Sequence, residues 1–149
     1  MQHLIHQHTD PNESAWLNEG LSELSLHING LEPDREEQYA QHTDIQLNNL
    51  SYHPDTVGAH YAAAFLFTNY FRELYGESAT QALSRHPANG LQACAQVLIG
   101  LDSPMTIARF FADWPVDTFL AGIGDPSSAA MFQVETRIPR SRRSAFLKN

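Results

Sequence analysis

The sequence predicts a mostly α-helical domain, and three observations support this fold class. Apolar side chains recur at helical spacing in several segments, and two of these segments end at a glycine, Gly30 and Gly76. Only residues 131–138 alternate as a strand does, which is too little for a sheet that stands alone. The chain has 149 residues, 42% of them apolar, which suits a single domain with a buried core.

The first expected elements lie in the N-terminal third of the chain. Residues 9–12 form a turn cluster, and a helix then runs from about residue 14 to residue 29, with Gly30 as its stop. Its apolar stripe consists of Leu17, Leu21, Leu24 and Ile28. Residues 31–57 are polar and acidic and predict a long loop, which in a compact domain is often a lid or a binding loop. The loop carries the short apolar patch Ile45, Leu47 and Leu50.

The remaining helices follow without a long interruption. We expect them at residues 57–75, 77–86, 90–99 and 104–121, with a kink or break in the last one at Pro115. The aromatic residues expected in the core are Trp16, Phe65, Phe67, Phe71, Phe110 and Trp114. Cys94 lies on an apolar helix face and is expected to be a small buried side chain.

Charge and cysteine content exclude several classes of function. Residues 1–136 hold all 17 acidic residues and only four of the nine basic ones, a net charge of −13, whereas the tail from Arg137 carries +5. Because residues 1–136 are this acidic, they repel a phosphate backbone, and we expect no nucleic-acid binding by the folded part. We interpret the basic tail as a solvated chain end. No apolar run is long enough for a membrane helix, and no signal peptide is visible. A single cysteine excludes an internal disulfide framework.

Seven of the eight histidines fall in the first 60 residues, and this half of the chain contains the candidate metal ligands. His3 and Glu19, on successive helices joined by a turn, could converge on one ion, because zinc binds imidazole and carboxylate. His6 lies one turn from His3, so a local site of His3, His6 and Glu19 is also conceivable. Spacing alone does not decide between these arrangements.

The segments QHLIH at residues 2–6 and WLNEGLSE at residues 16–23 resemble the gluzincin zinc metallopeptidases, in particular the group of hyicolysin and immune inhibitor A. These enzymes carry His-Glu-x-x-His on one helix and Asn-Glu-Gly on a later one. In the resemblance His3 matches the second histidine ligand and Glu19 the third zinc ligand. It implies the helical C-terminal half of a zincin-like catalytic domain over residues 1–122, followed by a poorly defined tail at 123–149.

The resemblance also implies roles for four further side chains. Glu23 would accept a hydrogen bond from a ligand histidine, and His6 would pack against or support a ligand without binding the metal. His60 and Tyr61 begin a helix that faces the substrate in related enzymes, so either one could donate a hydrogen bond to the oxyanion of the tetrahedral intermediate. The expected cofactor is zinc, and the expected substrate is a peptide or protein.

The first histidine and the catalytic glutamate of the motif would lie immediately before Met1. We therefore expect that the chain begins inside its own active-site motif, and that these 149 residues alone bind zinc weakly and hydrolyse little or no peptide. Related enzymes are commonly secreted, and the full-length enzyme would be too.

Two alternatives from other classes remain open. One is a non-catalytic helical interaction domain of peptidase ancestry, and the other is a local metal-binding module built from His3, His6 and Glu19. The sequence does not indicate an oligomeric state.

Overall fold

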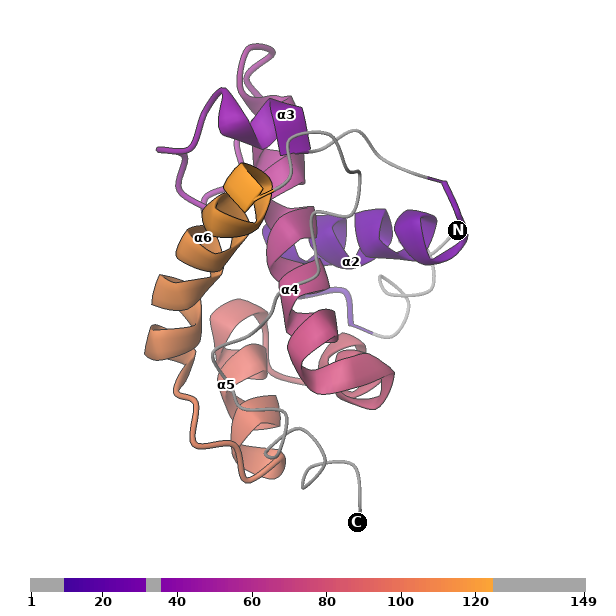
Figure 1. The fold of residues 1–149 in the computed structure, drawn as a ribbon. Coiled ribbons are helices and arrows are strands. Elements are labelled where there is room, and N and C mark those ends of the chain that lie inside the picture. Colours follow the sequence, from indigo (N-terminus) through magenta and orange to yellow (C-terminus); the bar gives the residue numbers. More distant parts are fainter. Residues whose placement is uncertain (1–9, 32–35, 125–149) are drawn as a thin grey trace.

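A computed structural model describes residues 10–31 and 36–124, and these residues are mostly helical with none in a strand (Figure 1). The predicted fold class is therefore confirmed. The helices are α2 Ala15–Ile28, α3 Glu36–Ala40, α4 Val57–Ser84, α5 Gly90–Gly100 and α6 Ile107–Gly124. The strand expected at 131–138 and the basic tail lie outside the described residues. No helix of the described part is long and apolar enough to cross a bilayer.

Helix α4 lies at the centre of the described structure and contacts α2, α3, α5 and α6 (Figure 1). Its first half is apolar around most of its circumference, with buried side chains at nearly every position from Ala59 to Phe71. Such a helix is stable only when other elements cover all its sides, which explains its central position.

An aromatic cluster joins three of the helices around Phe67 of α4. The Phe67 ring packs edge-to-face against Trp16 of α2 at 5.3 Å between centroids, and against Phe110 and Trp114 of α6 at 5.1 and 5.8 Å. Edge-to-face packing of this kind stabilises a core beyond the area that it buries. All six aromatic residues predicted for the core are buried, and Cys94 of α5 is fully buried as well.

The structure confirms one of the predicted helix boundaries and changes two others. The predicted helices 57–75 and 77–86 lie end to end within α4, whose backbone leaves helical geometry between them at Gly76, where φ is 81°. The segment 31–57 is not a loop throughout, because it contains the short helix α3. Helix α6 is not split at Pro115. Proline removes one helical hydrogen bond there, but the packing of Phe110 and Trp114 against Phe67 keeps the segment helical.

The N-termini of α2 and α5 are joined by one carboxylate. Oε1 of Glu13 accepts hydrogen bonds from the backbone N–H of Ser14 at 2.6 Å, from the Ser14 hydroxyl at 2.8 Å and from the N–H of Gly90 at 2.8 Å. A carboxylate is favourable at helix N-termini because it satisfies free N–H groups and the positive end of the helix dipole. This contact holds the beginning of α2, and with it the WLNEGLSE segment, against the rest of the domain.

Candidate functional site

The candidate site lies where α2 crosses the first half of α4, and Gly20 determines how closely the two helices approach. A Cβ atom at position 20 would lie 2.5 Å from the carbonyl oxygen of Ala64 and 2.8 Å from Cγ2 of Thr68. The Thr68 hydroxyl lies 3.0 Å from the Gly20 carbonyl oxygen, to which it can donate a hydrogen bond. The crossing is therefore too close for any side chain, and it fixes the position of Glu19, the next residue along α2.

Tyr61 of α4 is the hydrogen-bond partner of Glu19 across this crossing. Burial, followed by the negative charge of Glu19 and the hydrogen bond to Glu19, raises the pKa of Tyr61 to about 12. Smaller contributions come from Tyr52 and Glu23, which places both near the phenol. At neutral pH the Tyr61 hydroxyl is therefore protonated and donates to the Glu19 carboxylate.

Glu23 lies one turn after Glu19 on the same side of α2, as residues four apart on a helix do. Its side chain is buried, with 8% of its surface exposed, while Glu19 is half-buried. The site thus contains two carboxylates and a phenol at the junction of two helices. Carboxylate oxygens bind divalent metal ions, and a hydrogen bond from a second residue commonly orients such ligands.

His60 is also placed in this part of α4, but its environment differs from that of Tyr61. Its side chain is only 6% exposed, burial lowers its pKa, and its Nδ1 atom has no hydrogen-bond partner among the residues that the structure describes. The imidazole is therefore neutral at neutral pH. Of the two residues predicted to serve the oxyanion, the structure brings Tyr61 into contact with Glu19.

The two histidines of the predicted site, His3 and His6, lie outside the described residues. Within residues 10–31 and 36–124, no three His, Cys, Asp or Glu side chains gather closely enough to hold a metal ion. The described part of the predicted site therefore consists of Glu19 and Glu23.

Two features of the site did not emerge from the sequence. The first is the hydrogen bond between Tyr61 and Glu19, and the second is the nearby Tyr52, which is 67% exposed in the segment before α4. The signal that could have indicated the crossing is the set of small residues Gly20, Ala64 and Thr68, because small side chains allow two helices to approach closely.

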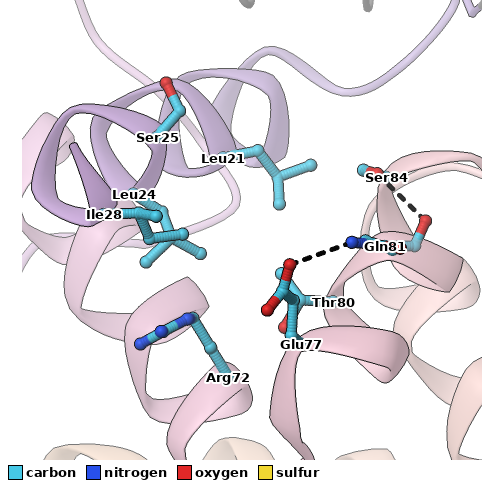
Figure 2. A pocket seen from close by; sticks show the side chains of 9 residues that line it. All are labelled: Leu21, Leu24, Ser25, Ile28, Arg72, Glu77, Thr80, Gln81 and Ser84. Atoms are coloured by element: carbon cyan, nitrogen blue, oxygen red, sulfur yellow. Dashed lines mark hydrogen bonds between the residues drawn. The ribbon is translucent and has the colours of Figure 1, made fainter.

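A shallow depression of about 230 Å³ lies on another face of α2, against the second half of α4 (Figure 2). Apolar side chains of α2 form one wall, and polar side chains around the Gly76 kink form the other. Its lining includes Leu21, Leu24, Ile28, Arg72, Glu77 and Gln81. None of the candidate site residues lines it.

Comparisons with protein-family models, with curated proteins and with solved structures found no match to this chain.

Proposed function

We propose that this chain is the helical part of a zinc-dependent metallopeptidase catalytic domain, which hydrolyses peptide bonds with a zinc-activated water. The observation that carries the proposal is the position of Glu19. This residue of the WLNEGLSE segment is half-buried at a close helix crossing and accepts a hydrogen bond from Tyr61. A fixed and hydrogen-bonded carboxylate is what a metal ligand requires.

The side chains at the crossing fit a divalent metal ion. Glu19 and the buried Glu23, one turn apart on α2, place two carboxylates on one side of this helix in a partly buried place, where a cation would offset their negative charge. His3 and Glu19 would hold zinc, which when bound polarises the scissile carbonyl and lowers the pKa of its water.

The other residues would serve this centre from the protein side. Glu23 would accept a hydrogen bond from a ligand histidine and keep its ring in one orientation, and His6 would support a ligand without binding the metal. His60 and Tyr61 are the candidates for donating a hydrogen bond to the oxyanion. The first histidine and the catalytic glutamate of the motif are not among these 149 residues, so we expect weak zinc binding and little peptidase activity from them alone.

A second candidate function is a helical interaction domain, and one observation favours it. Leu26, Ile28 and Leu31, at the end of α2, are 41%, 52% and 61% exposed, next to the apolar wall of the depression. Exposed apolar patches of this kind often bind another protein. The third possibility is the local metal module of His3, His6 and Glu19.

A zinc titration of the wild-type chain and three variants separates these functions. The wild-type chain, Glu19→Ala and His6→Ala would be titrated with Zn²⁺ in competition with a chromophoric chelator, with Glu37→Ala on the exposed surface of α3 as the control. We expect Glu19→Ala to abolish zinc binding, while His6→Ala and Glu37→Ala retain it. Loss of binding in both Glu19→Ala and His6→Ala would identify the local module instead. Absence of zinc binding in the wild-type chain would contradict the peptidase proposal and favour the interaction domain.

A further inference from the structure

We propose that Tyr61 is a positioning residue for Glu19: its hydroxyl holds the carboxylate in the orientation in which Glu19 binds the metal ion. This inference rests on the proposed function and adds to it a specific task for Tyr61. It differs from a role in oxyanion stabilisation, because the hydroxyl would act on the ligand and would not need to touch the substrate.

The geometry of the helix crossing supports this task. Ala64 is the residue of α4 whose carbonyl oxygen faces Gly20, and Tyr61 precedes Ala64 by three residues, so both lie on the face of α4 that meets α2. Glu19 directly precedes Gly20. Because Gly20 and Ala64 are in contact, Tyr61 and Glu19 lie at the junction of the two helices. There the Glu19 carboxylate acts on the Tyr61 phenol through its charge and a hydrogen bond.

The chemistry of the pair suits a ligand and its support. A phenol has an ordinary pKa near 10 and donates a single hydrogen bond at neutral pH. An ionised carboxylate offers about four lone-pair sites on two oxygens, so one bond from a phenol leaves sites for a metal ion. Because α2 and α4 are held together at Gly20, the donor is fixed to the scaffold, and the carboxylate loses rotational freedom before any metal arrives.

Tyr52 provides a matched comparison in the same neighbourhood. It lies close enough to influence the Tyr61 phenol, but it is 67% exposed and belongs to the segment before α4. Removing its hydroxyl changes the same chemical group near the site without removing the bond to Glu19.

The test measures zinc affinity and metal-free stability in the full 149-residue chain. Tyr61→Phe, Tyr52→Phe and Glu19→Ala would each be titrated with Zn²⁺, after circular dichroism confirms that the helices are retained. Loss of a hydrogen bond that orients a metal ligand typically weakens binding about 10- to 100-fold. We expect a weakening of about tenfold or more for Tyr61→Phe, no measurable change for Tyr52→Phe and complete loss for Glu19→Ala.

A second readout needs no metal. Urea midpoints of Tyr61→Phe, Glu19→Ala and the double variant, measured with a chelator present, report whether the two side chains interact in the folded protein. We expect Tyr61→Phe to lower the midpoint in the wild-type background and to lower it less in the Glu19→Ala background.

The outcomes separate this inference from the proposed function. If Glu19→Ala abolishes zinc binding and Tyr61→Phe leaves it unchanged, Glu19 remains the ligand and the positioning role is wrong. Additive urea shifts would likewise overturn it, because the contact would then be absent. If the wild-type chain binds no zinc, or if Glu19→Ala still binds it, the proposed function fails and the positioning role fails with it.

Discussion

Gly20 shows at the residue scale why a glycine follows the candidate ligand Glu19. Its carbonyl oxygen lies 3.0 Å from the Thr68 hydroxyl, and the space where its Cβ would lie is occupied by the backbone of α4. The glycine therefore serves close packing of two helices, and the position of Glu19 depends on it. Neither feature requires a catalytic role for Gly20 itself.

Replacement of Gly20 by alanine is expected to destabilise the protein. Alanine would favour the helical backbone by about 1 kcal/mol. Overpacking against the fixed Ala64 carbonyl, however, typically costs about 1–3 kcal/mol and can cost more, so we expect a net loss of up to about 2 kcal/mol. Urea unfolding followed by circular dichroism measures it. Gly100→Ala, where no atom lies within 4 Å of the added Cβ, is the control and should be neutral or stabilising; equal effects at both positions would contradict the close crossing.

Residue-level prediction succeeded for the core, whereas the contact between Tyr61 and Glu19 was not predicted. The aromatic core residues and Cys94 could be identified because burial follows helical periodicity, which is a local property of the sequence. The bond between Tyr61 and Glu19 could not, because it depends on how α2 and α4 are rotated about their axes. That rotation is set by the contact between Gly20 and Ala64, which are far apart in the sequence.

At the scale of elements, glycine and proline signals had different reliability. Gly76 interrupts α4 as predicted, because its φ of 81° is readily available only to glycine. Pro115 does not split α6, which contacts α4 before and after the proline. Before it, Phe110 and Trp114 pack on Phe67, and after it Asp117 accepts a hydrogen bond from Tyr70 at 2.6 Å. The short helix α3 was missed because its sequence is mostly polar. Its Tyr39 packs against Trp114 with 5.6 Å between the ring centroids, a contact that the local sequence pattern does not reveal.

The Glu13 carboxylate gives a prediction at the same scale, because it joins two helix N-termini. Glu13→Ala removes the acceptor of three hydrogen bonds and should destabilise the protein by about 1.5–3 kcal/mol, the range for bonds to charged groups. Chemical denaturation compared with Glu73→Ala measures this effect. Glu73 forms a solvent-accessible pair with Arg72 at 3.2 Å, and its loss should cost less than about 1 kcal/mol. A Glu13→Ala variant as stable as Glu73→Ala would show that the two N-termini are not held by this group.

The described part of the molecule is organised around a buried central helix, α4. The sequence predicted the fold class, but it did not predict the contacts between the helices. Composition and periodicity predicted a mostly helical domain. They did not predict which helices touch, because the aromatic cluster around Phe67 combines residues from α2, α4 and α6. The apolar patch predicted within residues 31–57 does pack on the core, where Leu47 is 3% exposed.

The reactivity of Cys94 shows whether the helices remain packed around the core. It is fully buried, and burial, followed by the charge of Glu13, raises the pKa of its thiol to about 12. A raised thiol pKa means that the folded state favours the protonated thiol. The stability that this preference contributes is fully present below about pH 8.5, the ordinary thiol pKa. It declines as the pH rises toward 12.

The native thiol should therefore react only when the protein opens. We expect reaction with a disulfide reagent at pH 8 to be at least about 100-fold slower than in unfolding concentrations of urea, because only the accessible thiolate reacts. The absorbance of the released thiolate follows the reaction, and Cys94→Ala gives the baseline. Rapid labelling in native buffer would contradict the packing of α5 against the core.

The central claim is that Glu19 is a ligand of a zinc ion, and diffraction from zinc-loaded crystals of this chain at the zinc absorption edge tests it most directly. We expect an anomalous peak about 2.0–2.2 Å from a Glu19 carboxylate oxygen, with an imidazole nitrogen of His3 at about 2.0–2.1 Å from the same ion. A peak held by histidines with Glu19 remote from it, or no peak at the crossing of α2 and α4, would contradict the account.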